Sequence, residues 1–214
     1  MAPPNPIRLP GFEILRLLGS GGRGQVYLAR DQKTDTQVAV KVLTSGGDDL
    51  KSFQEEAWLL ARLSHPHLAR FLDYREGPPP HYALEYVDGL PLNQALEKAD
   101  ERQMLDIFVG AARGLHCLHA HGLVHGDLKP DNILVTGTGE TKLLDFGLPG
   151  FGTPAYWSPE AKAGRYDAQS DLYSLGLSFS ESLLHRKLPA YFRELLERLV
   201  QEDPTRRPSS STSS

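Results

Sequence analysis

The stretch that decides the fold covers residues 125–135 and reads His125-Gly126-Asp127-Leu128-Lys129-Pro130-Asp131-Asn132-Ile133-Leu134-Val135. It begins as a polar loop and ends as an apolar strand, with a carboxylate, an ammonium group and an amide close together in the loop. Asp127 can accept a proton, Lys129 can neutralise negative charge on a group in transfer, and Asn132 can bind a metal ion through its side-chain carbonyl. The loop is therefore a candidate catalytic site.

A second acidic motif follows in the sequence Leu143-Leu144-Asp145-Phe146-Gly147. Its carboxylate stands at the end of an apolar strand. In proteins, Mg²⁺ prefers a few carboxylate oxygens together with phosphate oxygens. Asp145 is therefore a candidate metal ligand, together with Asn132.

A glycine-rich segment lies far upstream, in Gly19-Ser20-Gly21-Gly22-Arg23-Gly24-Gln25-Val26. Glycines allow backbone amides to approach phosphate oxygens closely, although a flexible hairpin turn explains the same pattern. A dinucleotide site requires a strand, a loop and then a helix. Here residues 27–29 continue as a strand, so the loop lies inside a hairpin and a Rossmann domain is disfavoured.

A lysine interrupts the next apolar strand, in Val38-Ala39-Val40-Lys41. Burying an unpaired ammonium group is costly, so Lys41 needs a carboxylate or a phosphate, and Glu56 on the following helix is a suitable partner. The alternative is that Lys41 faces solvent on an edge strand.

Hydrophobic periodicity predicts strands first and helices afterwards. The helix that carries Glu56 has apolar residues at helical spacing from 53 to 63. The other predicted helices cover 92–99, 102–121, 171–185 and 188–201, and the predicted strands cover 12–18, 25–30, 37–43, 71–74 and 82–87.

In this order and at this spacing, the four motifs resemble the eukaryotic-type (Hanks-type) Ser/Thr protein kinase domain in its compact bacterial form. The resemblance covers residues 12–208. It includes the end of an activation segment at 152–160, the start of a central helix at 171–176 and a closing motif at 203–208. The intact Lys129 resembles the Ser/Thr-specific members.

The resemblance implies an α+β, two-lobed protein-kinase-like fold. Residues 1–87 would form a small β-rich N-lobe, and residues 88–208 a mainly helical, shortened C-lobe. The serine-rich tail, residues 209–214, is predicted to be disordered.

The resemblance also implies a role for each motif residue. Asp127 would be the base, assisted by Lys129, while Lys41 would hold ATP phosphates and be oriented by Glu56. Asn132 and Asp145 would hold Mg²⁺. The residues implied in binding ATP are Leu18, Gly19, Ser20, Gly21, Gly22, Gly24, Val26, Ala39, Lys41, Glu85, Val87 and Leu134.

The same resemblance implies three internal contacts of the C-lobe. Asp171 would anchor His125, and Phe146 would stack with His125. Arg207 would pair with Glu160.

Composition narrows the class of partner. The chain has 214 residues with 23 Lys and Arg against 27 Asp and Glu, a net charge of -4, which disfavours nucleic acid. No apolar run is long enough to span a bilayer, and the N-terminal residues have no apolar signal core. The single cysteine, Cys117, cannot form an internal disulfide, so without an export signal we expect a cytoplasmic protein. The resemblance implies that its substrates are proteins modified on Ser or Thr.

The chain departs from the family pattern at its catalytic loop and activation segment. Gly126 stands where many protein kinases have an arginine that binds an activating phosphate. The segment 148–157 is short, and Thr153 is its only Ser or Thr. Gly126 predicts an enzyme that does not depend on phosphorylation of its activation segment, and the short segment predicts a site that is constitutively open.

The C-terminal region is also shorter than in the family. Between Asp171 and Arg207 there is room for about two helices, and a docking helix of the family is missing. We expect uncovered apolar surface near Leu183, Leu184 and Leu188, available for a second copy of the chain or for a partner.

Two other functions remain open at this point. His-Gly-Asp also occurs in small-molecule phosphotransferases, although these usually lack the equivalent of Lys129. The other alternative is a pseudokinase-like scaffold that binds ATP without transferring phosphate. The group His116, His119, His121 and His125 could suggest zinc, but zinc sites need converging ligands, usually with thiolates or carboxylates beside them.

Overall fold

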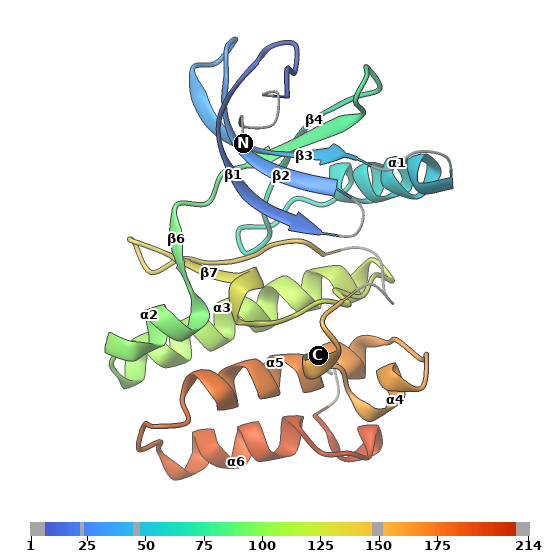
Figure 1. Cartoon of the computed structure of the whole chain (residues 1–214). Coiled ribbons are helices and arrows are strands. Elements are labelled where there is room, and N and C mark those ends of the chain that lie inside the picture. The colour runs from blue at the N-terminus through green and yellow to red at the C-terminus, as the bar shows by residue number, and fades with distance from the viewer. Residues whose placement is uncertain (1–6, 22–23, 45–47, 147–151, 209–214) are drawn as a thin grey trace, which may run out of the picture. The chain divides into compact units, whose positions relative to one another are not determined.

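The computed structural model describes residues 7–21, 24–44, 48–146 and 152–208, which fall into two compact units. The first unit runs to Ser64 and includes Ala69–Tyr86. The second comprises His65–Leu68 and the chain from Val87 onward. The first unit is rich in strands and the second is mainly helical, as the α+β prediction requires (Figure 1). The division differs from the predicted lobes, because residues 65–68 and Val87 belong to the second unit.

The first unit is a five-stranded antiparallel sheet in the order β1-β2-β3-β5-β4, with one helix, α1. Its elements are β1 (Phe12–Gly21), β2 (Gly24–Asp31), β3 (Thr36–Leu43), α1 (Asp48–Ala61), β4 (Phe71–Arg75) and β5 (His81–Glu85). All were predicted to within a few residues, because their apolar side chains recur at the period of the element they form.

The two faces of this sheet bury different side chains. Val38, Val40 and Val42 alternate along β3, and all three are buried in an apolar cluster with Phe12 and Ala83. The opposite face carries Lys41 and Tyr82, which contact Glu56 of α1. Helix α1 therefore covers that second face. Successive side chains of a strand point to opposite faces, so Lys41 lies on the face away from the three valines.

The second unit contains five helices and a three-stranded antiparallel sheet, β6-β7-β8, among its described residues. The helices are α2 (Leu92–Lys98), α3 (Glu101–Ala120), α4 (Pro159–Lys162), α5 (Ala168–Ser182) and α6 (Ala190–Leu199), and the strands are β6 (Gly89–Pro91), β7 (Ile133–Thr136) and β8 (Thr141–Leu143). No described helix combines the length and apolar character needed to cross a bilayer.

Local sequence explains where the long helices begin. Asp100 and Gln103 form a reciprocal capping box at the start of α3, and Asp167 and Ser170 form another at the start of α5. Each box satisfies backbone N–H groups that the first turn of a helix leaves unpaired.

Aromatic packing joins the helices behind the candidate site. The rings of Phe108, Phe179 and Phe192, from α3, α5 and α6, meet edge to face with centroids 5.1 to 6.3 Å apart. Helices α5 and α6 lie side by side (Figure 1), and a Cβ at Gly176 would come within 2.6 Å of Leu199. Glycine at this position therefore permits the close approach of the two helices.

Candidate active site

Lys41 is paired with Glu56, as we predicted because burying an unpaired ammonium group is costly. Its Nζ lies 2.6 Å from Oε1 of Glu56, and the side chains are 20% and 6% exposed. The same carboxylate oxygen accepts a hydrogen bond from the Tyr82 hydroxyl at 2.7 Å. Strand β3 lies between β2 and β5, so the edge-strand interpretation of Lys41 is wrong.

Sheet register places three of the predicted ATP-binding residues on one face. Val26 pairs with Lys41 across β2 and β3, and Ala39 lies two residues from Lys41 on the same strand. Because side chains alternate between faces, Val26, Ala39 and Lys41 share the face that is opposite to the apolar cluster.

The glycine-rich segment forms the end of the β1–β2 hairpin, as predicted. Leu18, Gly19, Ser20 and Gly21 close β1, and Gly24 opens β2 opposite Gly21. A Cβ at Gly24 would lie 2.2 Å from the Val42 carbonyl oxygen, so sheet pairing alone requires glycine there. The predicted contact of Gly22 lies outside the described residues.

The contacts of Asp127 organise the catalytic loop of the second unit. Its Oδ2 lies 3.0 Å from Nζ of Lys129 and 3.2 Å from Nδ2 of Asn132. Its Oδ1 accepts the backbone N–H of Thr153 at 2.7 Å, while Lys129 also donates to the Thr153 hydroxyl at 2.9 Å. A carboxylate held by donors on both oxygens has a defined orientation, which a positioned general base requires.

Asp171 of α5 anchors the start of this loop from beneath. Its Oδ2 accepts the His125 backbone N–H at 2.7 Å, and its Oδ1 accepts that of Gly126 at 3.0 Å. The His119 ring contacts the same carboxylate at 2.8 Å. The predicted anchoring of His125 by Asp171 is confirmed.

His125 is buried beside this anchor. Burial lowers its pKa, and its Nδ1 accepts the Asp127 backbone N–H at 3.4 Å. The ring meets Phe146 edge to face at 6.0 Å between centroids, as expected for these residues. Together with Asp171, it fixes the backbone on which Asp127 stands.

Asn132 and Asp145 present oxygen atoms that suit Mg²⁺. The Asn132 amide nitrogen donates to the Asp127 backbone carbonyl at 2.7 Å, so its side-chain oxygen is the atom that could bind a metal ion. Asp145 is exposed and has a φ of 51°, a left-handed conformation that costs energy outside glycine. A carboxylate and an amide oxygen form the hard donor set that Mg²⁺ prefers, so these residues fit the ion.

The remaining predicted ATP contacts are Glu85 of the first unit and Val87 and Leu134 of the second. Val87 is buried, and Leu134 is half-buried on β7. The Glu85 backbone N–H donates to the Arg70 carbonyl at 2.8 Å, so this N–H is not available to a ligand.

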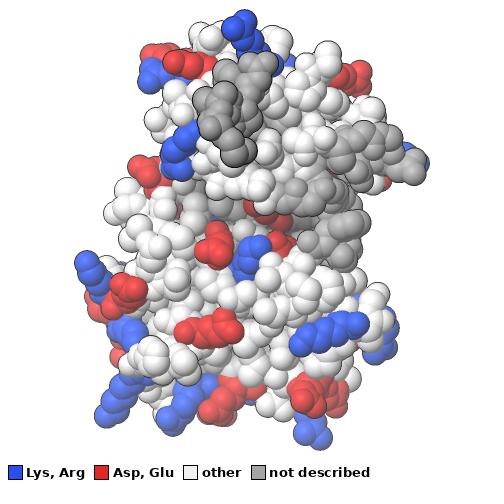
Figure 2. All heavy atoms as spheres, in the orientation of Figure 1, with Lys and Arg blue, Asp and Glu red and all other residues white. Residues whose placement is uncertain are grey.

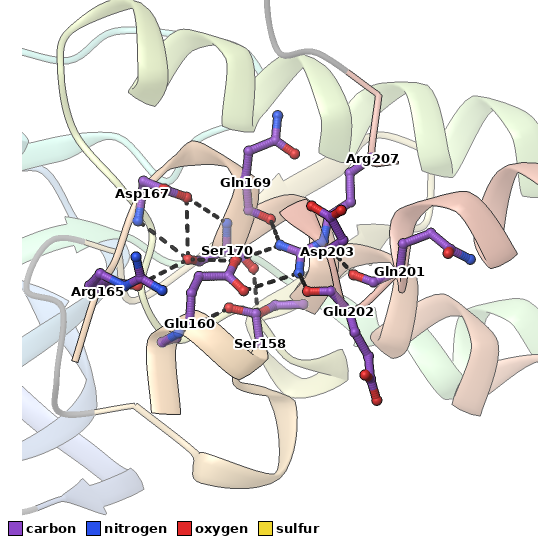
Figure 3. A network of polar contacts seen from close by, with 12 residues as sticks. Ser158, Glu160, Arg165, Asp167, Gln169, Ser170, Gln201, Glu202, Asp203 and Arg207 are labelled. Carbon is purple, nitrogen blue, oxygen red and sulfur yellow. Dashed lines mark hydrogen bonds and ion pairs between the residues drawn. The ribbon is translucent and has the colours of Figure 1, made fainter. Parts of the chain in front are cut away.

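Glu160 and Arg207 form the predicted ion pair in the second unit. Nη2 of Arg207 lies 3.0 Å from Oε2 of Glu160, while Nη1 binds the other carboxylate oxygen. Figure 3 shows Arg207 also donating to backbone carbonyls of Gln201 and Gln169. The pair joins the start of α4 to the end of the described chain.

Comparison with known proteins agrees with this geometry. A model of the protein kinase domain matches residues 12–191. This chain belongs to the protein kinase domain family. The kinase domain is 39% identical over 189 residues to the DNA damage-responsive serine/threonine-protein kinase RqkA of Deinococcus radiodurans, covering 77% of this chain and 28% of that protein.

Mycobacterial relatives give a similar result. Serine/threonine-protein kinase PknA of Mycobacterium tuberculosis is 37% identical over 206 residues, covering 83% of this chain and 48% of the relative. Serine/threonine-protein kinase PknB of Mycolicibacterium smegmatis is 34% identical over 203 residues, with 80% and 32% covered. The kinase domain thus spans less than half the length of these relatives.

Sequence reasoning missed three contacts of this kinase domain. Tyr82 binds the carboxylate of Glu56, Thr153 binds Asp127 and Lys129, and His119 binds Asp171. Tyr82 lies on β5, which becomes the neighbour of β3 only in the folded sheet, so the sequence carried no signal for its contact with Glu56. His119 was considered only as a zinc ligand, and the described residues contain no group of three His, Cys, Asp or Glu side chains suited to a metal ion.

Proposed function

We propose that this kinase domain transfers the γ-phosphoryl group of Mg-ATP to Ser or Thr hydroxyls of proteins. The observation that carries the proposal is the orientation of Asp127, whose two carboxylate oxygens are held by Lys129, Asn132 and the Thr153 N–H. The relatives named above are all serine/threonine-protein kinases, which supports the class of acceptor.

Each residue group has a part in the reaction. Asp127 orients the acceptor hydroxyl and takes its proton as the oxygen bonds to the γ-phosphorus and the bond to the leaving ADP oxygen breaks. Lys129 stabilises the negative charge near that oxygen. Asn132 and Asp145 would hold Mg²⁺, which neutralises charge on the phosphate oxygens. Lys41, oriented by Glu56, binds the phosphates of the bound nucleotide.

ATP is proposed to contact the glycine-rich hairpin and the shared face of the first unit. Val26 and Ala39 lie on that face beside Lys41, and Val87 and Leu134 are the proposed contacts from the second unit. We place the domain in the cytoplasm, since its only cysteine, Cys117, suits a reducing compartment.

We also infer that activity does not require phosphorylation of the activation segment. Gly126 has a φ of 76° and carries no cation for a phosphate. The Thr153 hydroxyl already binds Lys129, and the Tyr156 carbonyl accepts a hydrogen bond from Ser174 at 2.8 Å. These contacts hold residues 153–156 without a phosphate group. Phosphatase-treated protein should keep its rate, whereas an inactive protein restored by phosphate within 148–157 would overturn the inference.

The activity is tested by transfer of labelled γ-phosphate from ATP with Mg²⁺. The acceptors are the protein itself, a generic basic protein and a mixture of hydroxylated metabolites, with Asp127→Asn as control. We expect label on Ser or Thr that disappears in the control, while nucleotide binding persists. Label on metabolites alone would establish a small-molecule kinase instead, and nucleotide binding without any transfer would favour a scaffold.

A further inference from the structure

A groove of about 590 Å³ lies between the end of α5 and helix α6 in the second unit. Leu183, Leu184, Leu188 and Leu196 are among its lining residues. This is the region in which the short C-terminal sequence predicted uncovered apolar surface. The groove is separate from the catalytic loop, because none of its lining residues belongs to residues 125–153.

The apolar part of the groove has a buried floor and an exposed rim. Leu183 and Leu196 are buried, whereas 74% of Leu184 is exposed. The apolar surface of a leucine this exposed, at the edge of a groove, is removed from water only when another molecule covers it. The groove thus offers an aliphatic contact surface.

Positive charge surrounds this surface. Arg186, Lys187 and Arg193 line the groove against one carboxylate, Glu197. The Arg186 guanidinium donates to the Leu96 carbonyl at 2.6 Å and is held by the fold. Within the described part of the chain, no carboxylate lies at ion-pair distance from Lys187 or Arg193. Figure 2 shows Lys and Arg gathered over the region where Figure 1 places the α5–α6 connection.

This charge distinguishes between possible occupants. If a second copy packed symmetrically on the same patch, Lys187 and Arg193 of one copy would face Lys187 and Arg193 of the other. Like charges facing one another disfavour association, while carboxylates would complement them. We propose that the groove binds a segment of a partner protein in which aliphatic side chains are flanked by Asp or Glu. The aliphatic side chains cover the exposed Leu184 beside the buried floor of the groove, and the carboxylates meet Lys187 and Arg193.

The test uses a phage-displayed library of random peptides selected on the whole chain. Peptides enriched on the wild type are synthesised with a fluorophore, and their binding is measured by anisotropy to the wild type and to two variants. The first variant is Leu184→Asp, and the second combines Lys187→Glu with Arg193→Glu. All three side chains are exposed, so the variants should fold. The matched control is Arg198→Glu, a charge reversal on α6 at a residue that does not line the groove.

We expect enriched peptides that combine Leu or Ile with Asp or Glu. Their binding should weaken about tenfold or more in each groove variant and remain unchanged in the control, with weaker binding at higher salt. The proposal would be overturned if the enriched peptides were basic, or if they bound both groove variants as tightly as the wild type. A dimer in light scattering that Leu184→Asp dissociates would also overturn it, because the second copy would then be the occupant. Transfer activity is measured separately, so failure here leaves the proposed phosphoryl transfer intact.

Discussion

Arg207 binds both carboxylate oxygens of Glu160, a residue 47 positions earlier in the chain. The side chain of Arg207 is fully buried, and that of Glu160 is 6% exposed. Backbone carbonyls of Gln201, Glu202 and Gln169 accept the remaining guanidinium hydrogens (Figure 3). The pair therefore links α4, α5 and the segment after α6 into one packed region, and its loss should be felt in the stability of the fold.

Arg207→Ala should lower the free energy of unfolding by about 3–5 kcal/mol, because it leaves the Glu160 carboxylate buried without its partner. Urea unfolding followed by circular dichroism measures the change. Arg206→Ala is the matched control, since Arg206 is 73% exposed and lies 3.7 Å from an exposed Asp203. The control should cost about 0–1 kcal/mol. Equal losses in the two variants would contradict a structural role for the buried pair.

The pH dependence of stability should report the same pair. Burial alone would raise the pKa of Glu160, but hydrogen bonds from Arg207, the backbone and Ser158 hold it at about 2, below the ordinary 4.5. A carboxylate with a lowered folded-state pKa stabilises the protein above its unfolded pKa, and this contribution is lost as the pH falls. Between pH 4.5 and about 2, stability should therefore fall more steeply in the wild type than in Glu160→Gln. Parallel curves from thermal unfolding would show that the pKa is not lowered.

Tyr82→Phe should weaken the support of the Lys41–Glu56 pair. The variant removes the hydroxyl that donates to Glu56 at 2.7 Å, and we expect a loss of about 1–2 kcal/mol in stability together with a higher KM for ATP. Tyr74→Phe is the control, because the buried Tyr74 hydroxyl has no hydrogen-bond partner among the described residues. Unfolding and steady-state kinetics measure both. An unchanged KM in Tyr82→Phe would argue against a positioning role.

Gly152→Ala should lower kcat by about 100-fold, since small displacements of reacting groups carry losses of that size. A Cβ at Gly152 would lie 2.4 Å from the Gly126 carbonyl oxygen and 3.1 Å from Cβ of Asp127. The backbone must then move, and the hydrogen bond from Thr153 to Asp127 moves with it. Gly137→Ala, where the new methyl meets nothing within 4 Å, should leave kcat unchanged. A Gly152→Ala enzyme with the wild-type kcat would show that the close packing of Gly152 against Gly126 does not position Asp127.

Many of the helices and strands, and the catalytic loop, could be predicted because they depend on residues that are close together in the sequence. Val38, Val40 and Val42 alternate at strand period, and all three are buried. Asp127 and Lys129 are close in sequence, so their side chains meet within one loop. Residue type and spacing therefore sufficed to predict the strands of the first unit and helices α1, α2, α3, α5 and α6, but not β6 or α4. The protein kinase fold was expected from the resemblance of the four motifs to that family.

Long-range partners depended on the tertiary structure. Tyr82 reaches Glu56 because β5 pairs with β3 in a register that sets Tyr82 opposite Lys41. Thr153 reaches Asp127 through packing across 26 positions. The groove at Leu184 likewise arises from how α5 and α6 meet. Backbone pairing uses the same N–H and C=O groups for nearly every residue type, so periodicity determines which face a side chain occupies, whereas register and packing determine what it touches.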